Sequence, residues 1–482
     1  MRERLERSTR LMTEGSIVGA LFTIAWPIVF ANTLHTAYQL IDTFWVGRLG
    51  AGAVAAVSVC YPLIFLFLGV GFGLSIAGSV FVSQYAGARQ HERVNHIAAQ
   101  ILLVMVCVAL ALSVLGIAVA GPVLHLIGVE DAVFDNALSY LRISYLGLVL
   151  SYGFIIFQSL LRGVGEVRLP LYIISSTVAL NAVLDPLFIF GGGPLPPAGV
   201  TGAAYATIVT QAIAASIGIG VLFGGRHGFH LKCRDFIPDP PLIRRAVMVG
   251  LPASLEQSNR TLGTLMLTFL ATGFGTIGLA TLGLGMRILS FMFIPALGLA
   301  MATATIVGQN IGAGNTERAR DVARLSAWTA FWSLNLVALL FFVFAPHIVR
   351  FFVPGDERLV VSGSEFIHIV SLSFGIIAAQ QVLLGAFRAA GGTTTAMLFS
   401  MVSMWVLQFP VSYVLCLHTS LGLTGIWWGF PLANTVAMVL VLAWFRRGTW
   451  LQMKLIGRTG PERERLELQV LEEAAGEDEY IG

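Results

Sequence analysis

The sequence predicts an all-α integral membrane protein, with twelve transmembrane helices arranged as two six-helix bundles around a central cleft. The first observation is composition: of 482 residues, 56% are hydrophobic and 11% are charged, whereas a soluble domain carries roughly a quarter charged residues. The second is the recurrence of charge-poor runs that exceed the roughly 18 to 20 residues needed to cross a bilayer. The third is an internal duplication. This composition excludes a water-soluble globule, a disordered chain and a nucleic-acid-binding domain.

Twelve apolar runs give the predicted membrane spans. The first run is too long for a cleaved signal peptide, so it is counted as a span. The remaining runs follow at short intervals to the end of the apolar region. The predicted spans are residues 17–44, 51–80, 96–120, 133–160, 169–192, 200–224, 244–272, 277–305, 322–345, 360–386, 395–417 and 423–445.

Basic residues alternate between the two sets of loops that these spans create. One set holds most of the loop Lys and Arg residues, whereas the other holds only Arg48, Arg350 and Arg358. An excess of Lys and Arg marks the cytoplasmic side. We therefore expect both termini in the cytoplasm and a multi-pass protein of the inner (cytoplasmic) cell membrane. The end of the chain is acidic, because residues 461–482 hold eight acids and two bases.

A pair of matching motifs indicates that the chain is duplicated. Gln84 and Gly87 after span two match Gln309 and Gly312 after span eight, at a constant offset of 225 residues. Six spans return the chain to the side it left, so the halves are parallel repeats about an axis along the membrane normal, as in alternating-access transporters. The predicted segments are a cytoplasmic N-terminal segment (1–16), a first bundle (17–224), a cytoplasmic linker (225–242), a second bundle (243–446) and an acidic cytoplasmic tail (447–482).

Three acids are predicted to lie well inside spans: Asp42, Asp185 and Glu256. An unpaired acid at bilayer depth costs about 3 kcal/mol or more, so a functional role is the default interpretation. Asn181 stands four residues before Asp185 and shares its helical face. If Asp42 and Asp185 face each other in a low dielectric, one keeps a proton or a cation bridges them. The structural alternative is that Asp185 hydrogen-bonds Asn181 only to hold helices together.

Span one carries a polar stripe that includes Asp42. His35, Gln39 and Asp42 stand at positions i, i+4 and i+7, and Tyr38 lies one turn from Asp42. The stripe therefore predicts a polar surface facing the bundle interior. The structural alternative is that Asp42 caps the polar end of this span near Arg48.

In span seven, Glu256, Asn259 and Arg260 stand at i, i+3 and i+4. One interpretation is an intrahelical salt bridge between Glu256 and Arg260, with Arg287 of span eight as a second partner. The other is a contact with substrate or cation in the second half. Both interpretations place these residues inside the second bundle.

Several of these features together resemble a known family. They are the six-plus-six layout, the two Gln-x-x-Gly-Ala loops, Pro27 with Asp42 in span one, and the Leu-Arg-Gly-x-Gly run at 161–165. The chain resembles the multidrug and toxic compound extrusion (MATE) family over about residues 15–450. The resemblance implies a cation-coupled efflux antiporter that is driven by sodium ions or protons.

The resemblance also implies which residues bind the coupling ion. The run Asn181-x-x-x-Asp185-Pro is similar to the DinF-like branch of the family. The family's cation site in the first half then falls on Asp42, Asn181, Asp185 and Thr201. The NorM-like branch places an acid in span ten, where residues 377–379 here are Ile, Ala and Ala. This departure argues against a cation site in the second half.

We therefore expect a secondary active multidrug efflux antiporter that exchanges protons or sodium ions for amphipathic, often cationic compounds. The expected partners are these small molecules and membrane lipid, with no nucleic acid, and the expected state is a monomer. No Walker loop, HExxH motif or Rossmann fingerprint is present, so we expect neither an enzyme nor a cofactor or metal beyond the coupling ion. The candidate substrate contacts are His35, Tyr38, Gln39, Tyr140, Gln158, Glu256, Asn259, Arg260 and Arg287.

The alternative function is a flippase for lipid-linked oligosaccharides, whose superfamily shares this layout. Its substrate carries pyrophosphate, so its cleft should be lined by Arg and Lys. The predicted first-half site carries acids instead. Arg260 and Arg287 in the second half keep this alternative open.

Overall fold

The fold is all-α, as the sequence predicts. The computed structural model describes residues 9–192, 196–225, 227–453 and 455. Part of the predicted N-terminal segment and the acidic tail from residue 456 onward lie outside the described residues. So do six of the basic residues that predict the orientation, namely Arg2, Arg4, Arg7, Arg226, Lys454 and Arg458.

The helices follow the predicted spans closely and extend several of them. The first half contains α2 (Ile17–Gly47), α3 (Ala51–Gly87), α4 (His91–Ile127), α5 (Asp131–Leu146), α6 (Leu148–Gly163), α7 (Arg168–Phe190) and α8 (Val200–Phe223). The second half contains α9 (Pro240–Thr272), α10 (Gly275–Gly312), α11 (Thr316–Phe352), α12 (Glu357–Ser371), α13 (Phe374–Ala389), α14 (Thr393–Met401), the π-helix η2 (Val402–Gln408), α15 (Phe409–Leu417) and α16 (Leu423–Arg447). Short 3-10 helices follow α8 and α16, namely η1 (Cys233–Phe236) and η3 (Thr449–Gln452).

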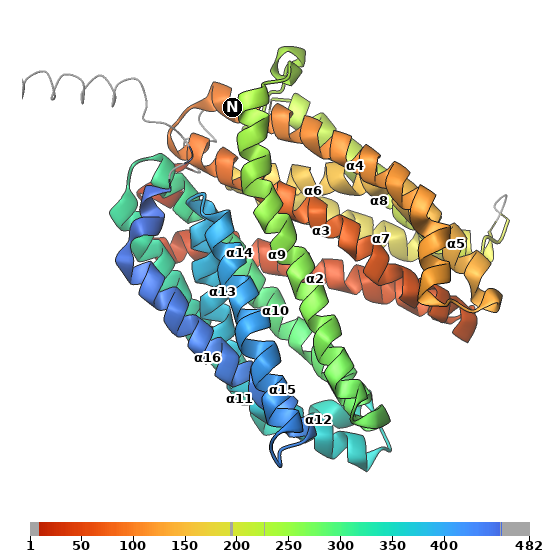
Figure 1. Ribbon diagram of the computed structural model, residues 1–482. Coiled ribbons are helices and arrows are strands. Elements are labelled where there is room, and N and C mark those ends of the chain that lie inside the picture. The colour runs from red at the N-terminus through yellow and green to blue at the C-terminus, as the bar shows by residue number, and fades with distance from the viewer. Residues whose placement is uncertain (1–8, 193–195, 226, 454, 456–482) are drawn as a thin grey trace, which may run out of the picture.

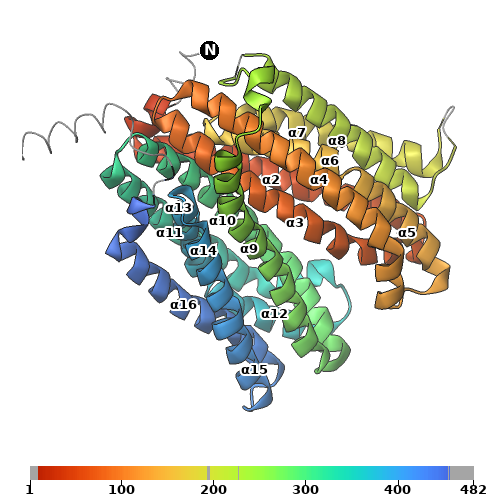
Figure 2. The same cartoon turned by 45° about the horizontal axis from the view of Figure 1, so that its top comes forward.

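Nine helices among the described residues are long and apolar enough to cross a membrane, and two bent pairs bring that number to eleven. The remaining predicted span is α9, whose Glu256 and Arg260 lower its hydropathy. In Figures 1 and 2, α3 to α8 gather on one side of the molecule and α11 to α16 on the other, with α9 running between them. The molecule is therefore a multi-pass membrane protein built from two bundles.

Two predicted spans are bent in the structure. Span 133–160 consists of α5 and α6, which meet at 46°, and span 360–386 consists of α12 and α13, which meet at 49°. Gly147 stands at the first bend, where a Cβ atom would come within 2.7 Å of the Ile208 side chain of α8. Apolar composition continues through both bends, so hydropathy alone cannot reveal them.

The two halves meet where α3 crosses α10. Gln84 Nε2 donates to the Ala389 carbonyl at 2.8 Å, and Gln309 Nε2 donates to the Gly163 carbonyl at 3.0 Å. A Cβ atom on Gly87 would overlap the backbone carbonyl of Gln309 in the opposite helix. The duplicated glutamines thus each bind the helix end of the other half, and the glycine permits close backbone contact.

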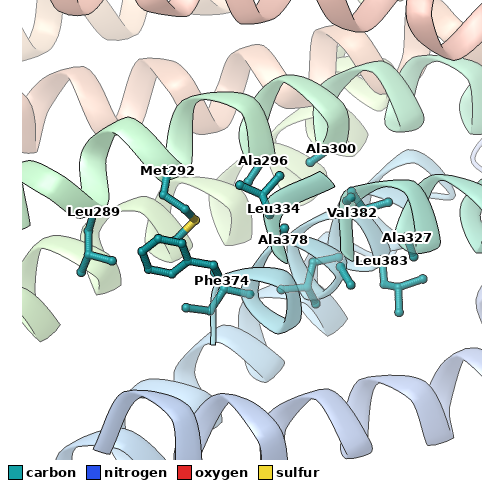
Figure 3. Close-up of a cluster of buried hydrophobic side chains, with 14 of the residues drawn as sticks. Leu289, Met292, Ala296, Ala300, Ala327, Leu334, Phe374, Ala378, Val382 and Leu383 are labelled. Carbon is teal, nitrogen blue, oxygen red and sulfur yellow. The ribbon is translucent and has the colours of Figure 1, made fainter. Parts of the chain in front are cut away.

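The core of the second half packs α10 against α11 and α13. Small alanines alternate with larger side chains at this contact, which lets the helices approach closely. Figure 3 shows the packed side chains Leu289, Met292, Ala296 and Ala300 of α10, Ala327 and Leu334 of α11, and Phe374, Ala378, Val382 and Leu383 of α13.

Candidate functional site

A small polar cavity lies inside the first half, between α2, α3, α5, α6 and α8. Its volume is about 110 Å³. One face of α2 supplies the predicted stripe, and the other helices add hydroxyl and amide groups. The polar lining consists of His35, Tyr38, Gln39, Asp42, Tyr61, Tyr140, Ser144, Ser151, Thr207 and Gln211.

Asp42 is buried in the wall of this cavity, with 4% of its surface exposed. The Tyr61 hydroxyl donates to Asp42 Oδ2 at 2.7 Å, whereas Oδ1 is buried without a hydrogen-bond partner among the described residues. The alternative, in which Asp42 caps the end of the span near Arg48, does not agree with the structure. The Arg48 guanidinium instead lies over the rings of Phe44 and Trp45, at 4.8 and 5.0 Å from their centroids. Asp42 therefore faces the bundle interior.

Asp185 and Asn181 are fully buried on α7 and share one face, as their spacing predicts. Asn181 Nδ2 donates to Asp185 Oδ1 at 2.9 Å. Neither residue is among those lining the 110 Å³ cavity. No hydrogen bond between the described side chains joins Asp185 to Asp42, but α2 and α7, the helices that carry them, pack against each other.

Three buried oxygens of this cluster lack a partner among the described residues: Asp42 Oδ1, Asn181 Oδ1 and Asp185 Oδ2. All three are acceptors when the acids are ionised, so the groups they lack are donors or cations. An unsatisfied buried polar atom costs roughly 1 to 3 kcal/mol. Carboxylate and amide oxygens suit a proton or a hard cation. The cluster therefore has the chemistry of an ion site.

The other predicted residues of the first half divide into two groups. His35, Tyr38, Gln39 and Tyr140 line the cavity with Asp42. Thr201 does not join them, because it lies in the first turn of α8 and its hydroxyl donates to the Ala198 carbonyl at 2.7 Å. Gln158, which is half-buried in α6, is also absent from the lining.

Sequence reasoning missed several polar residues of this site, among them Ser144, Ser151 and Gln211 of the lining. Tyr61 binds Asp42, Thr207 lines the cavity, and the Thr210 hydroxyl lies 3.2 Å from that of Tyr38. Thr207 and Thr210 are one turn apart on α8, so helical spacing could have grouped them. Their place opposite α2 depends on tertiary packing.

A second cavity, of about 270 Å³, lies in the second half between α9, α10, α13, α14 and α16. Asn259 and Arg260, two of the candidate substrate contacts, are among the residues that line it. Arg260 donates to Gln381 Oε1 at 2.7 Å, and the Trp405 indole donates to Asn259 Oδ1. Both polar residues are therefore held in place from neighbouring helices.

Glu256 is neutralised by arginines beside this cavity. Arg388 Nη1 lies 2.7 Å from Glu256 Oε1, and Arg260 Nη2 lies 3.9 Å from the same oxygen. The prediction that Arg287 is the second partner is wrong. Arg287 points to an exposed face of α10, whereas the last turn of α13 brings Arg388 against α9.

Comparisons with known proteins agree with this architecture. The MatE family model matches residues 27–187 and 252–414, one segment in each half. The probable multidrug resistance protein YoeA of Bacillus subtilis (strain 168) is 26% identical over 442 residues, which cover 91% of this chain and 95% of the relative. The probable multidrug resistance protein NorM of Thermotoga maritima is 27% identical over 448 residues, covering 91% and 94%.

A solved structure described as "Crystal structure of MATE in complex with MaL6" superposes with a TM-score of 0.87 at 24% identity, covering 92% of this chain and 99% of that one. This likeness concerns the fold. The names of the relatives do not separate the branches of the family, so the DinF-like assignment stays a prediction.

Proposed function

Because this chain belongs to the MatE family of multidrug efflux transporters, we propose that it is a secondary active antiporter. It exchanges protons or sodium ions for amphipathic, often cationic organic compounds by alternating access. It works in the inner cell membrane as a monomer, with both termini in the cytoplasm, and it catalyses no chemical reaction.

The observation that carries this proposal is the set of three unpartnered oxygens on Asp42, Asn181 and Asp185. A proton held by one acid, or a sodium ion bound by these oxygens, would supply a group that they lack and offset one of the two buried negative charges. The proposed ion site consists of these three residues. Thr201 stays a further candidate, because a hydroxyl that donates to the Ala198 carbonyl keeps its lone pairs for a cation.

Ion binding can drive transport only if the two end states bind the ion with different affinities. Both helices that carry the acids contain a proline, Pro27 in α2 and Pro186 in α7. Proline removes a backbone hydrogen bond and lets a helix bend within the membrane. We infer that filling the site changes the bend or packing of α2, and so shifts the equilibrium between the inward-open and outward-open forms.

We propose that the substrate binds in the same cavity of the first half. Tyr61 and Tyr140 supply aromatic faces beside Asp42, which suits an amphipathic cation. The cavity of about 110 Å³ is smaller than the roughly 300 Å³ or more of typical ligand sites. Helices around it therefore have to separate when a drug-sized compound binds.

The second candidate is the lipid-linked oligosaccharide flippase. Arg260 favours it, because this cation lines the second cavity. A pyrophosphate substrate needs several cations. Among the described lining residues of the two cavities, Arg260 is the one arginine, and Asp42 carries the opposite charge. Efflux of a cationic dye, compared with translocation of a labelled lipid-linked oligosaccharide, separates the two functions.

The test of the proposal uses vesicles that contain the purified protein. Efflux is measured with an imposed pH gradient or an imposed sodium gradient, each without the other. We expect one gradient to drive efflux, and we expect Asp42→Asn and Asp185→Asn to lower it at least tenfold while the protein still inserts. Asp135→Asn is the matched control, because Asp135 is an exposed acid of the same half. Full efflux by the double variant Asp42→Asn, Asp185→Asn would contradict the mechanism.

A further inference from the structure

The second half carries a large groove that the proposed transport function does not use. It lies between α11, α13 and α16 and has a volume of about 730 Å³. We propose that this groove binds an anionic phospholipid, with the acyl chain along the groove and the phosphate at an arginine cluster at its end. The proposal does not depend on the coupling ion or on the exported compound.

The body of the groove is apolar and opens to the outside of the bundle. Trp328 and Trp332 of α11 line it with 56% and 65% of their surfaces exposed. Ala327 of α11 and Leu383 of α13, both labelled in Figure 3, are buried lining residues at the base of the groove. From residue 320 to residue 332 a helix rises about 18 Å, which is similar to one leaflet of a hydrocarbon core of about 30 Å. The groove therefore has the length of a lipid chain.

One end of the groove is positively charged. Arg320 and Arg324 of α11 and Arg446 of α16 line it there. Arg324 forms an ion pair with Asp321 at 3.0 Å, whereas Arg320 and Arg446 make no ion pair within the described residues. The Arg320 guanidinium lies against Gly448, just after α16, which brings the two unpaired arginines to the same end.

The internal duplication allows the groove to be compared with the equivalent surface of the first half, which the linker covers. The counterparts of Arg320 and Arg446 in the first half are Asn95 and Phe223, at offsets of 225 and 223 residues. Asn95 accepts a hydrogen bond from the backbone of His230 at 2.9 Å. In the same way, the Phe223 ring stacks on Phe236 of the linker, with ring centroids 5.9 Å apart.

The linker thus occupies in the first half the positions that, in the second half, carry arginines without an ion pair among the described residues. A groove on the surface of a membrane-spanning bundle is surrounded by lipids, so a lipid is the occupant that we propose. Basic pockets between membrane helices near the interface bind anionic lipid headgroups, and guanidinium groups bind phosphate with charge-assisted, often bidentate hydrogen bonds. The charge at the end of the groove selects an anionic headgroup over a zwitterionic one.

The test measures lipid binding to the purified full chain in detergent by native mass spectrometry. Phosphatidylglycerol and phosphatidylcholine with the same acyl chains are titrated separately. We expect phosphatidylglycerol to bind at least tenfold more tightly, and Arg320→Gln with Arg446→Gln to remove this preference. The single variant Arg446→Gln, at an exposed position, should lower the preference for phosphatidylglycerol at least threefold. It replaces the double variant in the test if the double variant does not fold.

Two controls separate a lipid site from a simple charge effect. Arg350→Gln with Arg358→Gln removes the same charge from exposed positions outside the groove and should change the preference less than twofold. Met438→Trp fills the groove without changing its charge and should weaken both lipids. Equal binding of the two lipids, the same loss in the control pair, or competition by free glycerol phosphate as strong as by the lipid would each overturn the proposal.

Discussion

Each of the three acids inside the helices has a different set of partners. Asp42 receives one hydrogen bond from Tyr61, and Asp185 receives one from Asn181. Glu256 instead lies between two guanidinium groups. All three acids keep one buried oxygen without a hydrogen-bond partner among the described residues, but only the charge of Glu256 is compensated by arginines there. Neither burial nor a missing hydrogen bond alone therefore separates the proposed coupling acids from Glu256, whereas the missing counter-charge does.

The Glu256 ion pair gives a prediction about stability. Glu256→Gln leaves Arg388 and Arg260 buried or half-buried without their counter-charge, and breaking a buried pair costs about 3 to 5 kcal/mol. We expect the free energy of unfolding to fall by about this amount, measured by denaturation in detergent. Arg388→Gln should cost less, because Arg260 remains 3.9 Å from the carboxylate.

The exposed pair of Arg350 and Glu357 provides the control. Its atoms are 3.1 Å apart, but more than half of each side chain is exposed. Exposed ion pairs contribute about 0 to 1 kcal/mol, so Glu357→Gln should leave the free energy of unfolding nearly unchanged. Equal losses in Glu256→Gln and Glu357→Gln would show that the buried pair does not stabilise the second half.

Among single residues, the sequence identifies the buried acids and their partners on the same helix, Asn181 and Arg260, but it misses the partners on other helices. Asp42 and Asp185 stand out because acids are rare in apolar runs. Tyr61 does not, since a tyrosine in an apolar helix has many ordinary roles. Arg388 lies two residues beyond the predicted span 360–386, and only the packing of α13 on α9 reveals its contact with Glu256.

At the scale of elements, the contact between α3 and α10 depends on glycine. Gly87 and Gly312 each stand where the backbone of the other helix passes, so a Cβ atom on either would overlap a carbonyl oxygen of Gln309 or Gln84. The glutamines at the same crossing bind carbonyls across the interface. A change in helix spacing there would separate these hydrogen-bonding groups.

We therefore expect Gly87→Ala and Gly312→Ala to lower the free energy of unfolding by about 1 to 3 kcal/mol each, as overpacked contacts do. Thermal unfolding in detergent measures this loss. Gly283→Ala is the matched control in α10, because a Cβ atom there meets nothing within 4 Å. Alanine favours helix over glycine by about 1 kcal/mol, so the control should be unchanged or stabilised. Stabilisation of all three variants would contradict the close contact.

The sequence predicts the elements better than their shape. A helix or a bent helix pair lies at each of the twelve predicted spans, and the duplicated motif indicated the internal repeat but not that its residues lie at a helix crossing. The bends at 46° and 49° and the π-helix at Val402–Gln408 were not predicted, because they do not interrupt the apolar pattern. The crossing geometry follows from glycine contacts between helices that are far apart in the sequence.

At the scale of the whole molecule, the two halves share a plan and differ in chemistry. Helices α4 and α11 span matching residues at an offset of 225, from 91–127 and from 316–352. The first half carries two buried acids that form no ion pair among the described residues, whereas Glu256 of the second half is paired with arginines and Arg260 lines the cavity there. The ion site that we propose therefore belongs to the first half, while the second half holds its buried acid in an internal ion pair.

The orientation in the membrane gives a prediction for the whole chain. Cys233 is exposed in the linker beside Lys232 and Arg234, and basic loops stay in the cytoplasm. In a Cys107→Ser background, a membrane-impermeant maleimide should therefore label Cys233 in inverted vesicles and not in intact cells. Arg48→Cys, combined with Cys107→Ser and Cys233→Ser, places a single reactive cysteine in the loop between α2 and α3, because Cys60 and Cys416 are buried. This variant should be labelled in intact cells, and the reverse pattern would mean that the charge distribution does not set the orientation.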